Sequence, residues 1–254
     1  TTTSDASGGW SYTTAALTDG AHNFTATETV SDNTGGVSLA LSVTIDTSAP
    51  VTPAIASFST DSGVVGDHIT NDNTLTLAGT TEAGSVVKVY DGVTLLGSAT
   101  ADGSGNWSYT TAALANGAHS LTATATDVAG NTSAASSALS VTIDAAAPAT
   151  PAIAAFSTDS NIVGDHITND NTLTLVGSTE AGSVVKVYDG ATLLGSATAD
   201  GSGNWSYTTA ALANGAHSLT ATATDVAGNT SAASSALSVT IDASAPATPA
   251  IGSY

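Results

Sequence analysis

The stretch from Gly105 to Pro148 reads GNWSYTTAALANGAHSLTATATDVAGNTSAASSALSVTIDAAAP and contains two runs in which apolar and polar residues alternate. In residues 119–127, Leu and Ala alternate with Ser and Thr, and in residues 138–144, Leu, Val and Ile do the same. A period of two predicts β-strands with one buried face. Asn116-Gly117, just before the first run, is a turn signal. The stretch therefore predicts β structure, with Thr-rich outer faces that keep the strands soluble.

The same pattern continues upstream of this stretch. We expect strands at residues 54–58, 73–79, 85–91, 93–101 and 107–111, with a hairpin turn at Asp91-Gly92 and a loop at residues 102–106. No long helical periodicity is present. Together with the two strands above, these make seven short strands separated by regular turns. This pattern predicts an all-β fold of seven-stranded immunoglobulin-like β-sandwich domains.

The chain repeats itself. Residues 52–149 and 150–247 match over 98 positions, and the seven differences are all small or conservative. They are Ser57/Ala155, Gly63/Asn161, Val64/Ile162, Ala78/Val176, Thr80/Ser178, Val93/Ala191 and Ala146/Ser244. A period of this length is too long for a solenoid unit of about 20–50 residues, and it suits one sandwich domain of about 100 residues.

The repeat boundaries divide the 254 residues into four parts. Residues 1–50 are the C-terminal part of a truncated repeat, 51–148 and 149–246 are complete repeats, and 247–254 begin another. Short Ala/Pro linkers such as residues 145–151 join the domains, and their prolines favour an extended backbone. We expect the array to continue beyond both ends of this chain.

The charge balance excludes some classes of partner. The chain has 21 acidic and 2 basic residues and a formal net charge of −19. Nucleic acid and anionic membrane surfaces are excluded because both are bound through Lys and Arg, and no apolar run reaches the length that membrane insertion requires. The acidic residues either keep the chain soluble or bind cations, because Asp in loops offers the oxygen ligands that Ca²⁺ prefers. With no Cys, bound metal could replace disulfides as the stabilising link.

Four blocks follow one another in Gly105–Pro148: a Trp-Ser-Tyr strand, Leu-x-x-Gly-x-His, Thr-Ala-Thr-Asp-x-Ala-Gly-Asn, and an Asp before an Ala-Pro linker. This order resembles the bacterial Ig-like repeats of giant RTX-like surface adhesins exported by type I secretion. The resemblance covers nearly the whole chain. It implies a surface stalk, often with Ca²⁺ at or near domain junctions. The first copy departs from the pattern, because residues 28–33 stand where residues 127–131 stand in the next copy.

Sandwich topology predicts where such Ca²⁺ ions would bind. The Asp that ends the last strand of one domain should meet the loop before the last strand of the next domain. Two kinds of site are expected, one at each junction and a second within the long loop between the first two strands. The junction residues are Asp46 with Asp127 and Asn131, Asp144 with Asp225 and Asn229, and the strand-ending Asp242. The long-loop residues are Asp61, Asp67 and Asp72, repeated as Asp159, Asp165 and Asp170. The alternative is that these Asp residues only form turns and caps.

Other residue types are interpreted as structural. His22, His119 and His217 occupy the position of a tyrosine corner and should make a structural hydrogen bond. His68 and His166 are isolated, which is weak evidence for a metal ligand. Trp107 and Trp205 should lie in the core. No nucleophile elbow accompanies the Ser, His and Asp residues, and every candidate recurs in each repeat, so we expect no enzyme.

These observations predict a structural extender. The chain would form the stalk of a large bacterial surface adhesin, rigidified by Ca²⁺ and projecting a distal binding domain. We expect it outside the cell or on the bacterial surface. Its partners would be neighbouring repeats, with a host or cell-surface glycan or protein bound by a domain not present here. The alternative is that the repeats themselves bind a glycan or mediate contacts between cells in a biofilm.

Overall fold

The computed structural model describes residues 1–252. All the regular secondary structure that it assigns there is β-strand. Contacts between Cα atoms group the chain into two compact units. The first contains Thr1–Ser57, Leu77–Tyr109 and Leu121–Leu139, and the second contains Phe58–Thr76, Thr110–Ser120 and Ser140–Tyr254. The second unit thus holds all of the second repeat together with loops and strand ends of the first. The fold is clearest in that repeat.

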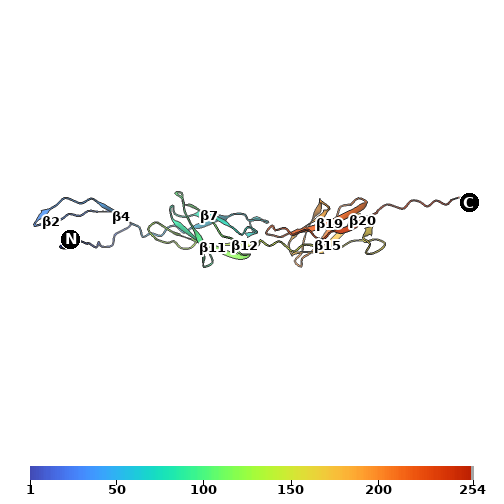
Figure 1. Ribbon diagram of the computed structural model, residues 1–254, viewed down its shortest axis with the longest axis horizontal. Coiled ribbons are helices and arrows are strands. Elements are labelled where there is room, and N and C mark those ends of the chain that lie inside the picture. Colours follow the sequence, from blue (N-terminus) through green and yellow to red (C-terminus); the bar gives the residue numbers. More distant parts are fainter. Residues whose placement is uncertain (253–254) are drawn as a thin grey trace. The chain divides into compact units, whose positions relative to one another are not determined.

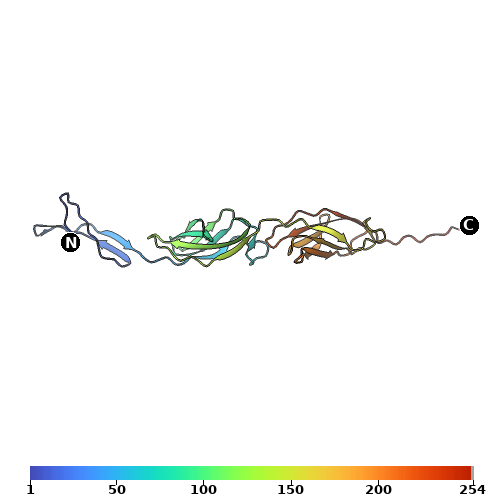
Figure 2. The same ribbon diagram turned by 90° about the horizontal axis from the view of Figure 1, so that it is seen from below.

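Two sheets form the second repeat. The smaller sheet has three strands in the order β13-β15-β18, and the larger has five in the order β14-β20-β19-β16-β17. The strands are β13 (Ala152–Phe156), β14 (Ile167–Thr168), β15 (Thr174–Ser178), β16 (Val184–Asp189), β17 (Thr192–Thr198), β18 (Asn204–Thr208), β19 (Gly215–Thr224) and β20 (Leu237–Ile241). Figure 1 shows β19 and β20 side by side, in orange to red, and Figure 2 shows the same strands turned by 90°. The all-β sandwich prediction is confirmed.

Alternation along the strands builds the core. In β19, Leu219, Ala221 and Ala223 are fully buried, and the Thr residues between them are only partly buried. β19 pairs antiparallel with both β16 and β20. Because side chains alternate between the two faces, this register turns the whole apolar set of β19 toward the opposite sheet. The outer face is left to Ser and Thr, as the sequence predicts.

Trp205 belongs to this core and is 3% exposed. It packs with the buried side chains of both sheets, namely Leu173, Leu175, Val185, Val187, Ala199, Leu219, Ala221, Val239 and Ile241. Gly177 faces it across the β15–β18 pair. A Cβ at residue 177 would lie 1.9 Å from the Ala152 carbonyl oxygen and 2.7 Å from Trp205 Cζ2. Glycine is therefore required for the indole and strand β13 to pack here.

An eighth strand was not expected from the sequence. β14 has only two residues, lies in the long loop and pairs parallel with β20. The backbone N–H groups of Thr240 and Asp242 donate to the carbonyls of His166 and Thr168, and Thr168 is 1% exposed. A two-residue strand shows no alternation, so no sequence pattern indicates it.

The first repeat has the same strand order. Its sheets are β10-β7-β5 and β6-β12-β11-β8-β9. The strands are β5 (Ala54–Phe58), β6 (Ile69–Thr70), β7 (Thr76–Thr80), β8 (Val86–Asp91), β9 (Thr94–Thr100), β10 (Asn106–Thr110), β11 (Gly117–Thr126) and β12 (Leu139–Ile143). Trp107 is 3% exposed, like its counterpart. The expected core role of both Trp residues is confirmed.

Residues 1–50 form two small antiparallel pairs, β1 (Gly20–Phe24) with β4 (Leu41–Ile45) and β2 (Thr29–Val30) with β3 (Asn33–Thr34). Trp10, at the position of the core Trp, is 59% exposed. The strands that precede the core Trp in a complete repeat have no counterpart in residues 1–50, which accounts for this exposure. Among residues 1–252, no helix is long and apolar enough to cross a membrane.

Candidate functional site at the repeat junction

A hydrogen-bonded turn at residues 225–229 carries the expected junction site of the second repeat. Asp225 is 8% exposed, and its two carboxylate oxygens accept from different donors. The Asn229 backbone N–H donates to Oδ1 at 2.8 Å, and the Asn229 side-chain amide donates to Oδ2 at 2.9 Å. The backbone N–H of Asp225 in turn donates to the Asn229 carbonyl at 3.0 Å. Both side chains are therefore held rigidly between β19 and β20.

The same amide reaches the end of the preceding repeat. Asn229 Nδ2 donates to the Asp144 carbonyl oxygen at 2.7 Å. All three residues belong to the second unit. The sequence predicts that Asp144, Asp225 and Asn229 come together, and in the structure they do. The contact uses the backbone carbonyl of Asp144, because its carboxylate instead accepts from the Ala146 N–H at 3.1 Å.

An equivalent arrangement exists in the first unit. Asn131 Nδ2 donates to Asp127 Oδ2 at 2.9 Å and to the Asp46 carbonyl at 3.1 Å. The hydrogen bond from the Asn131 side chain is the largest of the effects that hold the pKa of Asp127 below its ordinary value of 3.8. Asp46 Oδ1 accepts from the Ser48 N–H at 3.0 Å, as Asp242 Oδ1 accepts from the Ser244 N–H at 3.1 Å. Both copies of the turn therefore hold the last strand of the preceding copy through one amide.

The acidic residues of the long loop do not gather around one point. Asp67 and Asp165 each accept from the N–H two residues ahead at 2.9 Å. Asp72 and Asp170 accept from the N–H and hydroxyl of the Thr two residues ahead. These are the local turn contacts of the alternative interpretation. Throughout the described part of the chain, no three His, Asp or Glu side chains lie together as metal ligands.

Asp61 and Asp159 differ from the other loop carboxylates. Their Oδ2 atoms accept from the N–H of Gly66 at 2.6 Å and of Gly164 at 2.5 Å. Their Oδ1 atoms are buried and have no hydrogen-bond donor in either copy. A buried carboxylate oxygen needs a donor or a cation. This oxygen is therefore the position in the long loop best suited to a cation or a water molecule.

The orientation of the Asn229 side-chain amide decides whether the junction turn could hold Ca²⁺. An Asn side chain offers a nitrogen donor on one side and an oxygen acceptor on the other. With the nitrogen inward, Asn229 satisfies Asp225 Oδ2 and the Asp144 carbonyl without metal. If the amide turned by 180°, Asn229 Oδ1 would face Asp225 Oδ2 and the Asp144 carbonyl oxygen, which would bring three oxygens together. Oxygens so placed suit a hard cation, although Ca²⁺ takes about six to eight and would need water or further groups.

The His residues have structural partners. His217 Nε2 lies 2.9 Å from the Ala213 carbonyl, and Nδ1 lies 2.7 Å from Asp189 Oδ2. The bond to Asp189 raises the pKa of His217 above its ordinary 6.5, and the contact with Ala213 acts in the same direction. His22 and His119 make the same Nε2 contact four residues back, at 2.8 Å. The predicted structural hydrogen bond of this corner is therefore present in all three copies.

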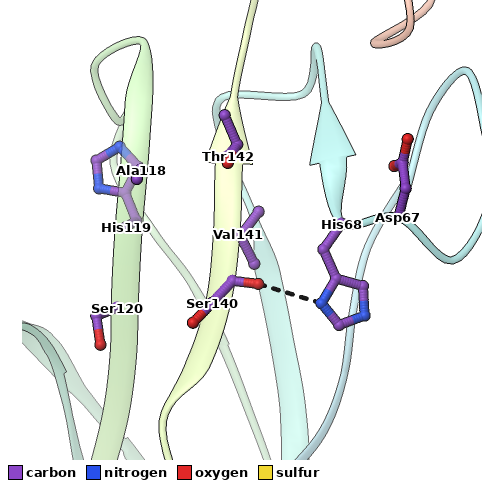
Figure 3. Close-up of a pocket in the computed structure, with 8 residues that line it drawn as sticks. All are labelled: Asp67, His68, Ala118, His119, Ser120, Ser140, Val141 and Thr142. Atoms are coloured by element: carbon purple, nitrogen blue, oxygen red, sulfur yellow. Dashed lines mark hydrogen bonds between the residues drawn. The ribbon is translucent and has the colours of Figure 1, made fainter.

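A shallow depression lies over the neighbouring strands β6, β12 and β11, lined among others by His68 and His119 (Figure 3). The His68 ring points at the Ser140 carbonyl, with Nδ1 at 3.1 Å, and Asp67 points away from both rings. His166 makes the same contact with Ser238. In Figure 3 the two imidazoles and the Asp67 carboxylate do not converge on one point.

The sequence did not single out Ser62 and Val64, which also contact the 225–229 turn. Ser62 Oγ donates to the Ala227 carbonyl at 2.6 Å, and the Val64 N–H donates to the Val226 carbonyl at 3.3 Å. Both contacts are between residues of the second unit. The sequence singled out only the carboxylates of this loop, as candidate Ca²⁺ ligands. No motif identifies a serine that bonds to a backbone carbonyl.

Two comparisons relate the chain to known sequences. Residues 49–145 and 147–243 each match the family model of the bacterial Ig-like domain. Exoglucanase B of Cellulomonas fimi is 40% identical over 228 residues, which cover 82% of this chain and 19% of the exoglucanase. The chain therefore spans about a fifth of that relative.

Solved structures show weaker likeness. The fibronectin(III)-like modules of Clostridium thermocellum CbhA share 20% identity with a TM-score of 0.43, covering 73% of this chain and 94% of theirs. A 1.5-MDa bacterial ice-binding adhesin shares 21% identity with a TM-score of 0.34, covering 70% of this chain and 62% of its own. The family assignment rests instead on the two tandem matches. The chain belongs to the bacterial Ig-like domain family.

Proposed function

We propose that this chain is a structural extender, in which tandem Ig-like domains hold another domain of the same protein away from the surface that carries it. The observation that supports this proposal is the amide contact repeated in identical form in the two complete repeats. Asn131 bonds the Asp46 carbonyl and Asn229 bonds the Asp144 carbonyl. A contact copied with each repeat limits bending wherever it occurs, which is what a spacer requires.

Ca²⁺ is part of this proposal. Asp225, Asn229 and the Asp144 carbonyl would hold one ion after the amide turns, with Asp127, Asn131 and Asp46 as the equivalent set. Asp61 and Asp159 would offer their unpartnered oxygens to a second kind of site. An extracellular type of site has a dissociation constant of about 10⁻⁴–10⁻³ M. With free calcium tenfold above that constant, each ion stabilises folding by about 1.4 kcal/mol.

We place the protein outside the cell or on the bacterial surface, as part of an adhesin. The similarity to a stretch of Exoglucanase B suggests a second setting, in which the repeats belong to a polysaccharide-degrading enzyme. The spacer role is the same in both settings, and the chain itself would carry no catalysis. Its immediate partners would be the neighbouring repeats.

The alternative role, glycan binding by the repeats, has less support. Proteins commonly present exposed aromatic rings to sugars, but Trp107 and Trp205 are each 3% exposed. Among the residues described, the large aromatic side chains that are clearly exposed are Trp10 and Tyr12, both in the partial first copy. Neither complete copy has a clearly exposed Trp, Tyr or Phe side chain among the residues described.

Small-angle X-ray scattering in millimolar calcium and then in chelator tests the spacer proposal. We expect an extended, stiff particle in calcium and a more flexible one in chelator. The variant N131A/N229A should be more flexible than the parent in both conditions, because it lacks the amide on which both forms of the contact depend. A parent chain that is flexible in calcium would refute the spacer role. A chain that is equally stiff in calcium and in chelator would refute only the proposed Ca²⁺ sites.

A further inference from the structure

The same five-residue turn, Asp-Val-Ala-Gly-Asn, lies in two different environments in this chain. In the first repeat, Val128 is 93% exposed and Ala129 is also exposed. In the second repeat, Val226 is 43% exposed and Ala227 is fully buried. Because the turns have identical sequences, the difference must come from what covers the second one.

The covering segment is the long loop of the preceding repeat. Ser62 Oγ donates to the Ala227 carbonyl, and the Val64 N–H donates to the Val226 carbonyl. Both segments belong to the second unit. Residues 1–50 contain no counterpart of this loop. The turn at Val128 and Ala129 therefore has nothing equivalent to cover it in this chain.

Gly63 lies at the point of closest approach. A Cβ at residue 63 would lie 2.1 Å from the Val226 carbonyl oxygen and 2.8 Å from the Ala227 carbonyl carbon and the Gly228 nitrogen. All three are backbone atoms, so they cannot move aside as the end of a flexible side chain could. The contact thus tolerates only glycine at this position.

The second repeat has Asn161 at the equivalent position. Its own loop accepts this residue without change, since Asn161 has a φ of 73° and Gly63 a φ of 69°. Asn is among the residues that adopt this left-handed conformation most readily. Ser160 Oγ accepts from the Asn169 N–H at 2.9 Å, as Ser62 Oγ does from the Asn71 N–H at 2.8 Å. The two loops therefore differ mainly in the side chain they present.

We propose that the residue at position 63 or 161 determines whether a repeat docks against the next one. A repeat with Gly63 seats its loop on the Val226–Gly228 turn of the following repeat. A repeat with Asn161 cannot seat its loop in this way on an identical turn, because the Asn Cβ would overlap the backbone. The array would then contain two kinds of joint, one with both the amide contact and the docked loop and one with the amide contact alone.

The test uses the whole chain, which has no Cys, so that spin labels attach only where Cys is introduced. Labels are placed through V93C and A191C, since Val93 is 99% exposed and Ala191 is exposed as well. The distance distribution is measured by electron–electron double resonance for the labelled parent, for G63N and for the matched control N161G. Each is measured in calcium and in chelator, because docking through Gly63 involves no metal.

We expect a narrower distance peak for the parent and for N161G than for G63N, both in calcium and in chelator, because the docked loop adds a constraint to the amide contact. Hydrogen exchange in the unlabelled chain provides a second measurement. The Val64 amide should lose its protection in G63N, while the Ile69 amide, which donates to Asp67 in the same loop, should keep its own. A broad distribution in the parent, or a G63N chain that keeps both the narrow peak and the Val64 protection, would overturn the proposal.

Discussion

Replacing Asn229 with Ala tests the junction contact directly. The change removes the amide that donates to Asp225 Oδ2 at 2.9 Å and to the Asp144 carbonyl at 2.7 Å. A hydrogen bond to a charged group is worth about 1.5–3 kcal/mol and one to a neutral group about 0.5–1.5 kcal/mol. The backbone bond from Asn229 to Asp225 Oδ1 remains, so the turn itself should persist. We expect the free energy of unfolding of the second repeat to fall by about 2–3 kcal/mol.

Native-state hydrogen exchange measures this loss for each repeat separately, which a single melting curve of a multidomain chain does not. The buried β19 amides of Leu219 and Ala221 report on the second repeat, and those of Leu121 and Ala123 in β11 report on the first. A loss of about 2–3 kcal/mol accelerates the β19 exchange roughly 30- to 140-fold.

The equivalent variant N131A provides the matched control. It should accelerate exchange in β11 and leave β19 close to the parent rate, because Asn131 bonds to Asp127 and Asp46 instead. Equal acceleration in both repeats, or a β19 rate unchanged in N229A, would refute the reasoning. Repeating the measurement in calcium separates the hydrogen bond from the metal, because an ion held by Asn229 would enlarge the effect.

Two further predictions concern the second repeat. The bond to Asp189 raises the pKa of His217 above 6.5, so its contribution to stability is fully present below pH 6.5 and is lost as the pH rises through the raised value. Burial would raise the pKa of Asp189, but hydrogen bonds led by the one from His217 lower it below 3.8, so its contribution is present above pH 3.8 and is lost as the pH falls through the lowered value. Stability against urea should therefore be greatest between about pH 4 and 6.5, and D189N should flatten this profile. The second prediction is that G177A destabilises the repeat by about 3 kcal/mol or more, measured by urea unfolding. The reason is that the new Cβ overlaps the Ala152 carbonyl and the Trp205 ring. G201A is the control, because a Cβ at residue 201 meets nothing within 4 Å.

Much of the fold could be read from residue patterns. Alternation predicted all seven of the longer strands in each complete repeat, and β19 shows why this works. Leu219, Ala221 and Ala223 are buried and the intervening Thr residues are not. Side-chain direction in a strand depends only on the parity of position, so one sequence run suffices. The corner role of His217 followed in the same way, from a motif whose partner lies four residues away.

Contacts between distant segments could not be read in the same way. Sandwich topology predicted that Asp144 would meet Asp225 and Asn229, but not that the contact would use a backbone carbonyl and an amide. The two-residue strand β14 is too short to leave a pattern. In the long loop, each Asp was as compatible with a turn as with a metal site, and only the fold shows which carboxylate oxygens already have donors.

The repeat length, the seven longer strands of each repeat, the acidic balance and the family can be inferred from the sequence alone, because each depends on local pattern and composition. Which backbone atoms approach one another where one repeat meets the next depends on the folded chain. Gly63 and Asn161 illustrate the difference, because both are ordinary residues for a left-handed loop position. Their consequence appears only when the Val226 carbonyl is placed 2.1 Å from where a Cβ would lie. Steric exclusion acts between atoms remote in sequence, and so only the folded structure reveals it.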